Sequence, residues 1–239
     1  MNRITISPRI RTTPFHESTV AAGATDITVY NKMVLPLSFG DLEAEYDRLI
    51  NGVAIWDVAV ERQVQISGPD AHVAAQYFTS RDITNMVEGQ GKYVAMCNHD
   101  GHILNDPVLM KLSGGRYWFS IADNDMLLWC KGIAAERGWD VEVTEPDVSP
   151  LAVQGPKAED LIAELVGEHV RDIRLLRFIE ADLDGIGSGV GDGTNNVGPV
   201  RGEPGGHIGD QQLGTGVPLL PQPGLKGADG SGGIDDRCW

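Results

Sequence analysis

The stretch GKYVAMCNHDGHILNDPVLMKLSGGRYWFSIA (residues 91–122) decides the fold of this 239-residue chain. Its apolar residues fall in three runs that predict strands at 92–98, 103–112 and 116–122. An Asp-Gly pair and a Gly-Gly pair lie between these runs, and both are typical of tight turns. The stretch therefore predicts three antiparallel strands that follow one another along the chain.

Strand and helix patterns alternate on either side of this stretch. A strand at 60–68 precedes a helix that starts near Asp70, whose carboxylate suits the positive end of the helix dipole. Beyond the three strands, the patterns predict a helix at 124–137, strands at 139–145 and 151–153, and a helix at 156–165. Antiparallel sheets with packed helices indicate the α+β class.

The composition of the chain changes near residue 186. The last 53 residues, 187–239, contain 16 glycines, 5 prolines and a single aromatic residue. Such a segment buries too little apolar surface to offset the conformational entropy that it loses on folding. We expect residues 1–186 to carry the fold and residues 187–239 to form a disordered tail.

The charge and the cysteine content indicate which binding partners and which cellular compartment suit the protein. The chain has 19 Lys and Arg against 34 Asp and Glu, a formal charge of −15, which repels nucleic acid and anionic lipid surfaces. Its 3 cysteines are too scattered for a disulfide framework, and no apolar run is long enough for a membrane span or a secretory signal. We expect a cytoplasmic protein that binds neither nucleic acid nor membrane.

Two groups of residues are weaker site candidates. His99 and His102 flank a tight turn without an obvious third ligand, so we expect no metal site. Aromatic side chains along the chain suit the core, but Tyr and Trp rings also suit a flat heteroaromatic cofactor or an onium cation. These aromatic residues are Trp56, Tyr93, Trp118, Phe119 and Trp129.

Asp106 is the best single candidate for a catalytic or binding residue. It lies beside Asn105 between two apolar runs, and strict alternation along a strand points one of the two side chains inward. A carboxylate in an apolar strand is costly unless it is bonded to something. We therefore expect Asp106 to face a site.

Several motifs occur in a fixed order along the chain, at 52–58, 66–71, 81–83, 91–98, 101–109 and 153–158. This series resembles the folate-binding N-terminal part of the glycine cleavage T-protein (aminomethyltransferase) family. The stretches at 6–15, 30–36, 61–64 and 120–125 resemble one branch of it, the tetrahydrofolate-dependent dimethylsulfoniopropionate demethylases. The resemblance covers residues 3–186 and implies the first domain and most of the second domain of a fold built around a pterin-binding cavity.

The resemblance also implies roles for particular residues, with tetrahydrofolate as the cofactor. Asp106 matches the aspartate that hydrogen-bonds the folate near its reactive nitrogens. Tyr93 matches the tyrosine beside it, and Ser120 falls where the family has a polar residue that contacts the pterin. T-proteins carry Asp-Asp-Leu where this chain has Asn105-Asp106-Pro107, a departure that the demethylase branch shares.

The implied reaction is methyl transfer from a small-molecule sulfonium to N5 of tetrahydrofolate. A sulfonium is already a good leaving group, so the protein acts mainly by positioning, while Asp106 orients the folate and manages the N5 proton. Trp56 or Trp118 would hold the cation through its ring face, although no matched motif supports either. The alternatives are a glycine cleavage aminomethyltransferase, a folate-dependent amine demethylase, or a non-catalytic folate-binding module.

The resemblance ends near residue 186, where the family continues with a folate-gripping block and a third domain. Recoding residues 209–220 and 228–239 one nucleotide out of phase permits segments that resemble the C-terminal part of the family. We therefore expect the tail to be an out-of-frame reading. The chain as written would then expose apolar surface and show weak or absent turnover.

Overall fold

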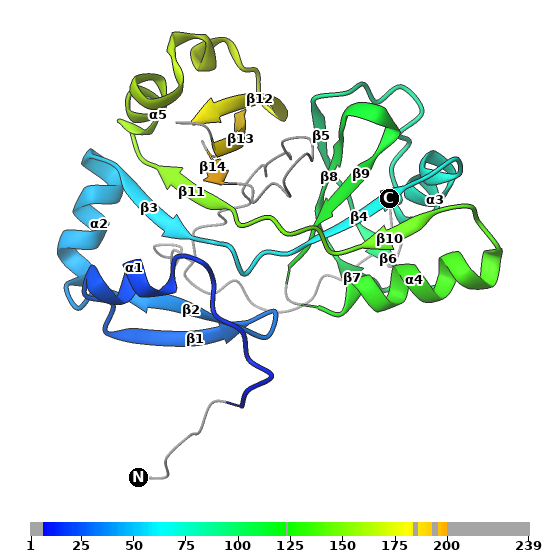
Figure 1. Cartoon of the computed structure of the whole chain (residues 1–239), viewed down its shortest axis with the longest axis horizontal. Helices are drawn as coiled ribbons and strands as arrows, with labels where there is room; N and C mark the ends of the chain where they lie inside the picture. Colours follow the sequence, from blue (N-terminus) through cyan, green and yellow to red (C-terminus); the bar gives the residue numbers. More distant parts are fainter. Residues whose placement is uncertain (1–6, 123, 184–185, 193–195, 200–239) are drawn as a thin grey trace, which may run out of the picture.

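The computed structural model describes residues 7–122, 124–183, 186–192 and 196–199 of the chain (Figure 1). The described α-helices are α1 (His16–Ala21), α2 (Leu42–Asn51), α3 (Ala71–Phe78), α4 (Met126–Arg137) and α5 (Ala158–Val166). Two short 3-10 helices span Ser113–Gly115 and Glu168–Asp172. None of the helices in this part of the chain is long and apolar enough to cross a membrane.

The strands form one large sheet and two hairpins. The first seven are β1 (Asp26–Tyr30), β2 (Met33–Ser38), β3 (Ala54–Asp57), β4 (Gln63–Ser67), β5 (Gln90–Tyr93), β6 (Met96–Cys97) and β7 (Ile103–Asn105). The others are β8 (Val108–Lys111), β9 (Tyr117–Ser120), β10 (Glu142–Thr144), β11 (Leu151–Gln154), β12 (Arg177–Leu183), β13 (Ile186–Asp192) and β14 (Asn196–Pro199).

The large sheet has ten strands in the order β10-β4-β9-β8-β5-β12-β13-β14-β11-β3, and its strand pairs are antiparallel. In Figure 1, α3 and α4 accompany β4, β8, β9 and β10, whereas α2 and α5 accompany β3 and β11. The hairpins are β1-β2 and β6-β7. This arrangement confirms the α+β class.

The predicted strands at 92–98 and 103–112 are each interrupted in the structure. β5 ends at Tyr93 and β6 begins at Met96, while β7 ends at Asn105 and β8 begins at Val108. Pro107 has no N–H to donate to a ladder, and its carbonyl accepts a hydrogen bond from the backbone N of Val94 at 3.0 Å. Both interruptions therefore fall at the same level of the sheet, where β6 and β7 separate as a hairpin.

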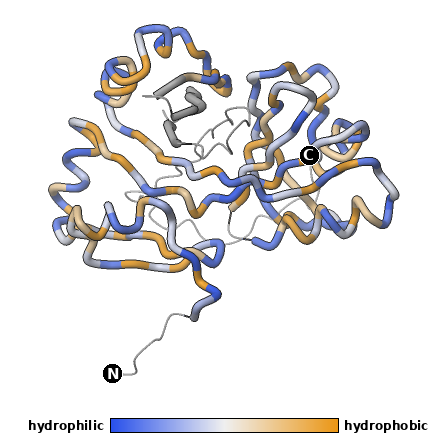
Figure 2. The backbone as a smooth tube through the Cα atoms, in the orientation of Figure 1, coloured by the Kyte–Doolittle hydropathy of each residue, from blue (hydrophilic) through white to orange (hydrophobic). Residues whose placement is uncertain are grey.

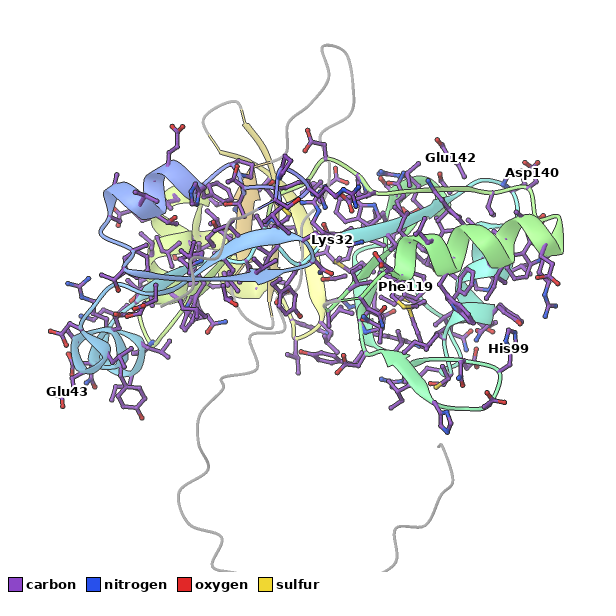
Figure 3. The ribbon with its side chains drawn as sticks, turned by 90° about the horizontal axis from the view of Figure 1, so that it is seen from below. Lys32, Glu43, His99, Phe119, Asp140 and Glu142 are labelled. Carbon is purple, nitrogen blue, oxygen red and sulfur yellow. The ribbon has the colours of Figure 1, made fainter. Side chains whose placement is uncertain are left out.

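The main core lies between the sheet and helices α3 and α4. Ile66, Leu109 and Phe119 contribute one face of the central strands, and Phe78 of α3 packs edge-on against Phe119 with ring centroids 6.5 Å apart. Figure 3 shows Phe119 beside α4. Figure 2 shows hydrophobic and hydrophilic residues alternating along α4, as in a helix with one face on a core.

A second cluster covers the opposite face of the same strands. Val108, Met110 and Trp118 pack there with Phe178 of β12, because side chains alternate between the two faces of a strand. Phe178 thus packs on the face that the α3 and α4 helices leave uncovered. This second face carries the candidate site described below.

Two glycine-containing motifs, at 52–58 and 153–158, meet in the structure. Gly155 has φ +119°, and a Cβ placed on it would lie 2.5 Å from the carbonyl oxygen of Gly52. The Lys157 backbone N donates to that same oxygen at 3.0 Å. Only glycine permits so close an approach of the two chains, so the motif is needed to join α2 to the start of α5.

Exposed apolar side chains are frequent on the N-terminal elements and on β3. Figure 2 shows hydrophobic stretches along β1 and β2. The exposed members in this region are Val20, Ile27, Val29, Leu37, Phe39, Leu42, Tyr46, Ile50, Ile55 and Trp56. The sequence predicted exposed apolar surface on the chain as written, without assigning it to particular elements.

Part of the predicted tail forms strands. β13 runs from Ile186 into the predicted tail, β14 lies within it, and β13 pairs with β12 along its whole length. The boundary of the folded region therefore lies beyond residue 186 in the structure. The prediction of disorder for residues 200–239 lies outside the described residues.

Replacing Phe119 by alanine tests the main core. Phe119 is fully buried, and truncation of such a ring lowers the free energy of unfolding by about 3–5 kcal/mol, because apolar contacts are lost and a cavity remains. Leu128→Ala on α4, where the leucine is 66% exposed, serves as the control and is expected to stay within about 0.5 kcal/mol. Urea unfolding followed by circular dichroism measures both; equal effects would contradict the assignment of the core.

Candidate functional site

The register of four neighbouring strands brings two of the predicted site residues into one row. Tyr93 pairs with Val108, Val108 with Ser120, and Ser120 with Gln63. Paired residues share a face of the sheet, so this row lies on the face of Val108 and Trp118 rather than on the face of the main core. The structure thus brings Tyr93 and Ser120 onto the same surface.

Asp106 lies two residues before Val108 of this row, outside the ladder and not in the environment that the sequence predicted. Of the neighbouring pair, Asn105 points inward and is 4% exposed, and its amide holds Ala122 through two hydrogen bonds. Asp106 is exposed, at the interruption between β7 and β8. The expectation of a carboxylate buried in an apolar strand was wrong, because the chain leaves the ladder at Pro107.

Tyr93 is the most accessible aromatic residue of the row. Its side chain is 48% exposed at the end of β5, and its backbone carbonyl accepts a hydrogen bond from Arg81 Nη1 at 2.9 Å. Partial burial raises the pKa of its phenol, and the negative charge of Glu61 raises that pKa further.

The two tryptophans that the sequence suggested as contacts for the methyl donor lie in different environments. Trp118 is 1% exposed and its Nε1–H donates to Gln65 Oε1 at 2.8 Å, so it belongs to the second core cluster and offers no free ring face. Trp56 is exposed on β3, the edge strand at the end of the sheet away from β4. Ser120 is in the row but buried.

Sequence reasoning missed Glu61, which lies two residues before the start of β4. The residue is half-buried, and burial raises the pKa of its carboxyl to about 7. A carboxyl with such a pKa is typical of functional sites, because it changes charge near neutral pH. In the sequence, Val60 and Arg62 on either side gave no sign that Glu61 would lose its solvent.

A second unsatisfied group lies next to Glu61. Gln63 is buried, and its Nε2 donates to the Glu61 backbone carbonyl at 3.1 Å. Its Oε1 is a buried acceptor for which the described residues supply no donor. Buried acceptors without a donor are rare, and they mark places where a ligand or water supplies one.

Arg62 points away from Glu61 toward the β10–β11 connection. Its guanidinium donates to the carbonyls of Val148 at 2.8 Å and Pro146 at 3.2 Å, and its Nε lies 3.3 Å from Glu145 Oε1. Arg11 also bonds Glu145, at 2.7 Å. The positive charge of Arg62, although next to Glu61 in the sequence, is therefore paired with Glu145.

The two histidines of the β6–β7 turn lie apart from this row. His99 packs on Trp129 with ring centroids 5.8 Å apart and lies 3.3 Å from the Tyr77 hydroxyl, at the edge of the molecule seen in Figure 3. Within the described residues, no group of three His, Cys, Asp or Glu side chains could hold a metal ion. Of the predicted site residues, Tyr93 and Ser120 share the row, whereas the two histidines lie elsewhere.

This architecture matches the fold of an aminomethyltransferase. The structure is similar to the glycine cleavage system aminomethyltransferase T from Bartonella henselae, with a TM-score of 0.69 and 19% sequence identity, over 80% of this chain and 54% of that one. At this level of identity, the similarity concerns the fold alone. Residues 15–190 match the GCVT N-terminal domain, and the chain belongs to this family.

A curated relative narrows the comparison. The chain is 49% identical over 180 residues to the dimethylsulfoniopropionate demethylase DmdA of Ruegeria pomeroyi. The matched segment covers 75% of this chain and 50% of that protein. The family resemblance seen in the motifs is thereby confirmed. The chain spans about half the length of the relatives it matches.

Glu145→Gln tests the ion pairs around Arg62. Burial raises the pKa of Glu145, but the hydrogen bond from Arg11 and the charge of Arg62 outweigh it, so the net pKa is lowered. The ionised carboxylate therefore stabilises the fold above the ordinary glutamate pKa, and this stabilisation is lost as pH falls through the lowered value. We expect the free energy of unfolding to fall more steeply in this acid range for the wild type than for Glu145→Gln.

Glu142→Gln provides the matched control for that measurement. Glu142 is exposed on β10, three residues before Glu145, and it is labelled in Figure 3. We expect its variant to keep the pH dependence of the wild type in urea unfolding between pH 3 and pH 7. Identical pH profiles for the wild type and Glu145→Gln would contradict the role of these ion pairs.

Proposed function

We propose that this chain is the folate-binding part of a tetrahydrofolate-dependent methyltransferase that acts on dimethylsulfoniopropionate. The observation that carries the proposal is the 49% identity over 180 residues to a relative named as the demethylase of that compound. The motifs around Tyr93, Asp106 and Ser120 support it, because they match the folate-contacting positions of the family.

The residues of the candidate site fit a reduced pterin. The exposed ring of Tyr93 offers a face for a flat heterocycle, and the exposed carboxylate of Asp106 offers acceptors for ring N–H groups. A pterin carries several N–H donors, so the exposed carboxylate of Asp106 and the ligand are complementary.

Bound tetrahydrofolate would supply N5 as the methyl acceptor: the S–CH3 bond breaks, an N–CH3 bond forms and the N5 proton leaves. The protein contributes mainly position, since ordered geometry alone supplies up to about 7–11 kcal/mol in favourable cases. Asp106 orients the folate through hydrogen bonds and Tyr93 supports its ring. Trp56 stays a candidate for contact with the donor, whereas burial of Trp118 argues against such a contact.

The proposed partners are tetrahydrofolate and a small-molecule methyl donor. The formal charge of −15 disfavours nucleic acid and anionic membrane surfaces. The scattered cysteines favour a reducing cytoplasm as the location.

Methyl transfer to tetrahydrofolate tests the proposal directly. Dimethylsulfoniopropionate with ¹³C-labelled methyl groups is incubated with the chain, and with a chimera that joins residues 1–183 to the C-terminal half of the Ruegeria pomeroyi relative. We expect both proteins to bind tetrahydrofolate and the chimera to produce 5-methyltetrahydrofolate, detected by NMR. Transfer only from methylamine or aminomethyl-lipoyl donors would favour the other enzymes of the family, and binding without transfer would favour a folate-binding module.

Asp106→Asn isolates the folate contact. A hydrogen bond to a charged group contributes about 1.5–3 kcal/mol, so we expect the Kd for tetrahydrofolate to rise about 10–100-fold. Asp100→Asn, in the exposed turn between β6 and β7, is the control and should leave the Kd unchanged. Calorimetric titration measures both, and an unchanged Kd in Asp106→Asn would remove Asp106 from the site.

A further inference from the structure

Asp106 lies outside the ladder, although the register of the sheet has a position for it. β8 pairs with β9 through Val108 and Ser120, and the neighbouring pairs follow in antiparallel order. Continuing this register by two residues would set Asp106 opposite Ala122. The chain instead leaves β7 at Asn105, and Asp106 is exposed. The position of Asp106 therefore depends on the residues that flank it, not on strand pairing.

The side chain of Asn105 takes the place of residue 106 beside Ala122. Its Nδ2 donates to the Ala122 carbonyl at 3.3 Å, and its Oδ1 accepts a hydrogen bond from the Ala122 backbone N at 3.1 Å. Two residues that form a hydrogen-bonded pair in an antiparallel ladder exchange the same kinds of bond. A side-chain amide has a donor and an acceptor, as a peptide group has, so Asn105 completes the ladder and leaves residue 106 outside it.

Pro107 anchors the chain on the other side of Asp106. The Pro107 carbonyl accepts a hydrogen bond from the Val94 backbone N at 3.0 Å, and Val94 directly follows Tyr93 at the end of β5. Proline has no N–H, so it needs no acceptor at this break in the ladder. Asp106 thus lies between one anchor at Ala122 and another anchor next to Tyr93.

A second asparagine also bonds Ala122. Asn31 lies in the two-residue turn between β1 and β2, where its φ of 46° suits asparagine or glycine. Its Nδ2 donates to the carbonyls of Val60 at 3.0 Å and Ala122 at 3.4 Å, and its Oδ1 accepts from the Asn124 backbone N at 3.1 Å. Both asparagines are buried. The Ala122 carbonyl is therefore held by two side chains, and it links the N-terminal hairpin to the backbone next to Asp106.

We propose that Asn105 is a positioning residue for folate binding, and that its amide, supported by Asn31 through Ala122, holds the Asp106 carboxylate where it bonds the folate. This proposal rests on the proposed function, in which Asp106 contacts the folate. Asn105 itself does not touch the ligand. Its effect is geometric, because a bound group has to be held close to its productive position for its hydrogen bonds to form.

Asn105→Leu tests the proposal, because it removes both bonds to Ala122 and keeps a side chain of similar shape. A misplaced carboxylate loses part of a charged hydrogen bond, so we expect the Kd of the full chain for tetrahydrofolate to rise about tenfold. Asn51→Leu, the same substitution at the exposed end of α2, is the control and should leave the Kd unchanged. Calorimetric titration measures the Kd, and circular dichroism verifies that each variant is folded.

A double-mutant cycle separates positioning from general destabilisation. Once Asp106→Asn has weakened the folate contact, Asn105→Leu should change the Kd by less than about twofold, because its effect acts through the same contact. A merely structural asparagine would lower the free energy of unfolding but leave the Kd of the folded protein unchanged. A tenfold effect that is independent of Asp106→Asn would place Asn105 in a role other than positioning this carboxylate.

Asn31→Gly decides the outcome if Asn105→Leu does not fold. Glycine keeps the left-handed turn but removes the amide, and we expect the Kd to rise about threefold. Lys32→Gly, at the other residue of this turn, is the matched control and should bind as the wild type (Figure 3).

An unchanged Kd in folded Asn105→Leu, or effects that add fully to those of Asp106→Asn, would overturn this proposal. If only Asn31→Gly folds, an unchanged Kd in that variant would overturn it. Absence of tetrahydrofolate binding by the wild type would instead overturn the proposed function.

Discussion

The antiparallel register of β4, β9, β8 and β5 is the constraint on which the candidate site depends. Each strand pair fixes which side chains are neighbours, and a shift of one residue would turn every side chain to the opposite face. The observed register directs Phe119 to the helices and leaves Tyr93, Ser120 and Gln63 on the other face. The core and the site are therefore two consequences of the same hydrogen bonds.

Three acidic residues at this end of the sheet differ in how far they are buried and in whether a positive charge compensates them. Glu145 is partly buried but compensated by Arg11 and Arg62, so its carboxylate is held ionised. Glu61 is desolvated without compensation, so its carboxyl is easily protonated. Asp106 stays exposed at the chain interruption that Pro107 causes. An ionised structural pair, a carboxyl that titrates near neutral pH and an accessible acceptor thus occur around one end of the sheet.

The sequence allowed the fold class and the family to be predicted because both depend on local signals. Alternating apolar residues and Gly-containing turns indicated the strands of the 91–122 segment, and motifs in a fixed order indicated the family. The strand interruptions were missed, since a periodic pattern continues through a ladder that Pro107 breaks. Trp118 was offered as a donor contact because its type suits a cation, but its indole is enclosed and bonded to Gln65.

The sequence by itself determined the class of fold, the family and the identities of Tyr93 and Asp106 as candidates, because residue types and spacing are preserved in the linear chain. Only the tertiary structure decided which of these side chains are accessible and which share a face. It also revealed Glu61, because the pKa of a carboxyl depends on how much water and how much opposite charge surround it. Those surroundings come from strands that are distant in the sequence and meet only after folding.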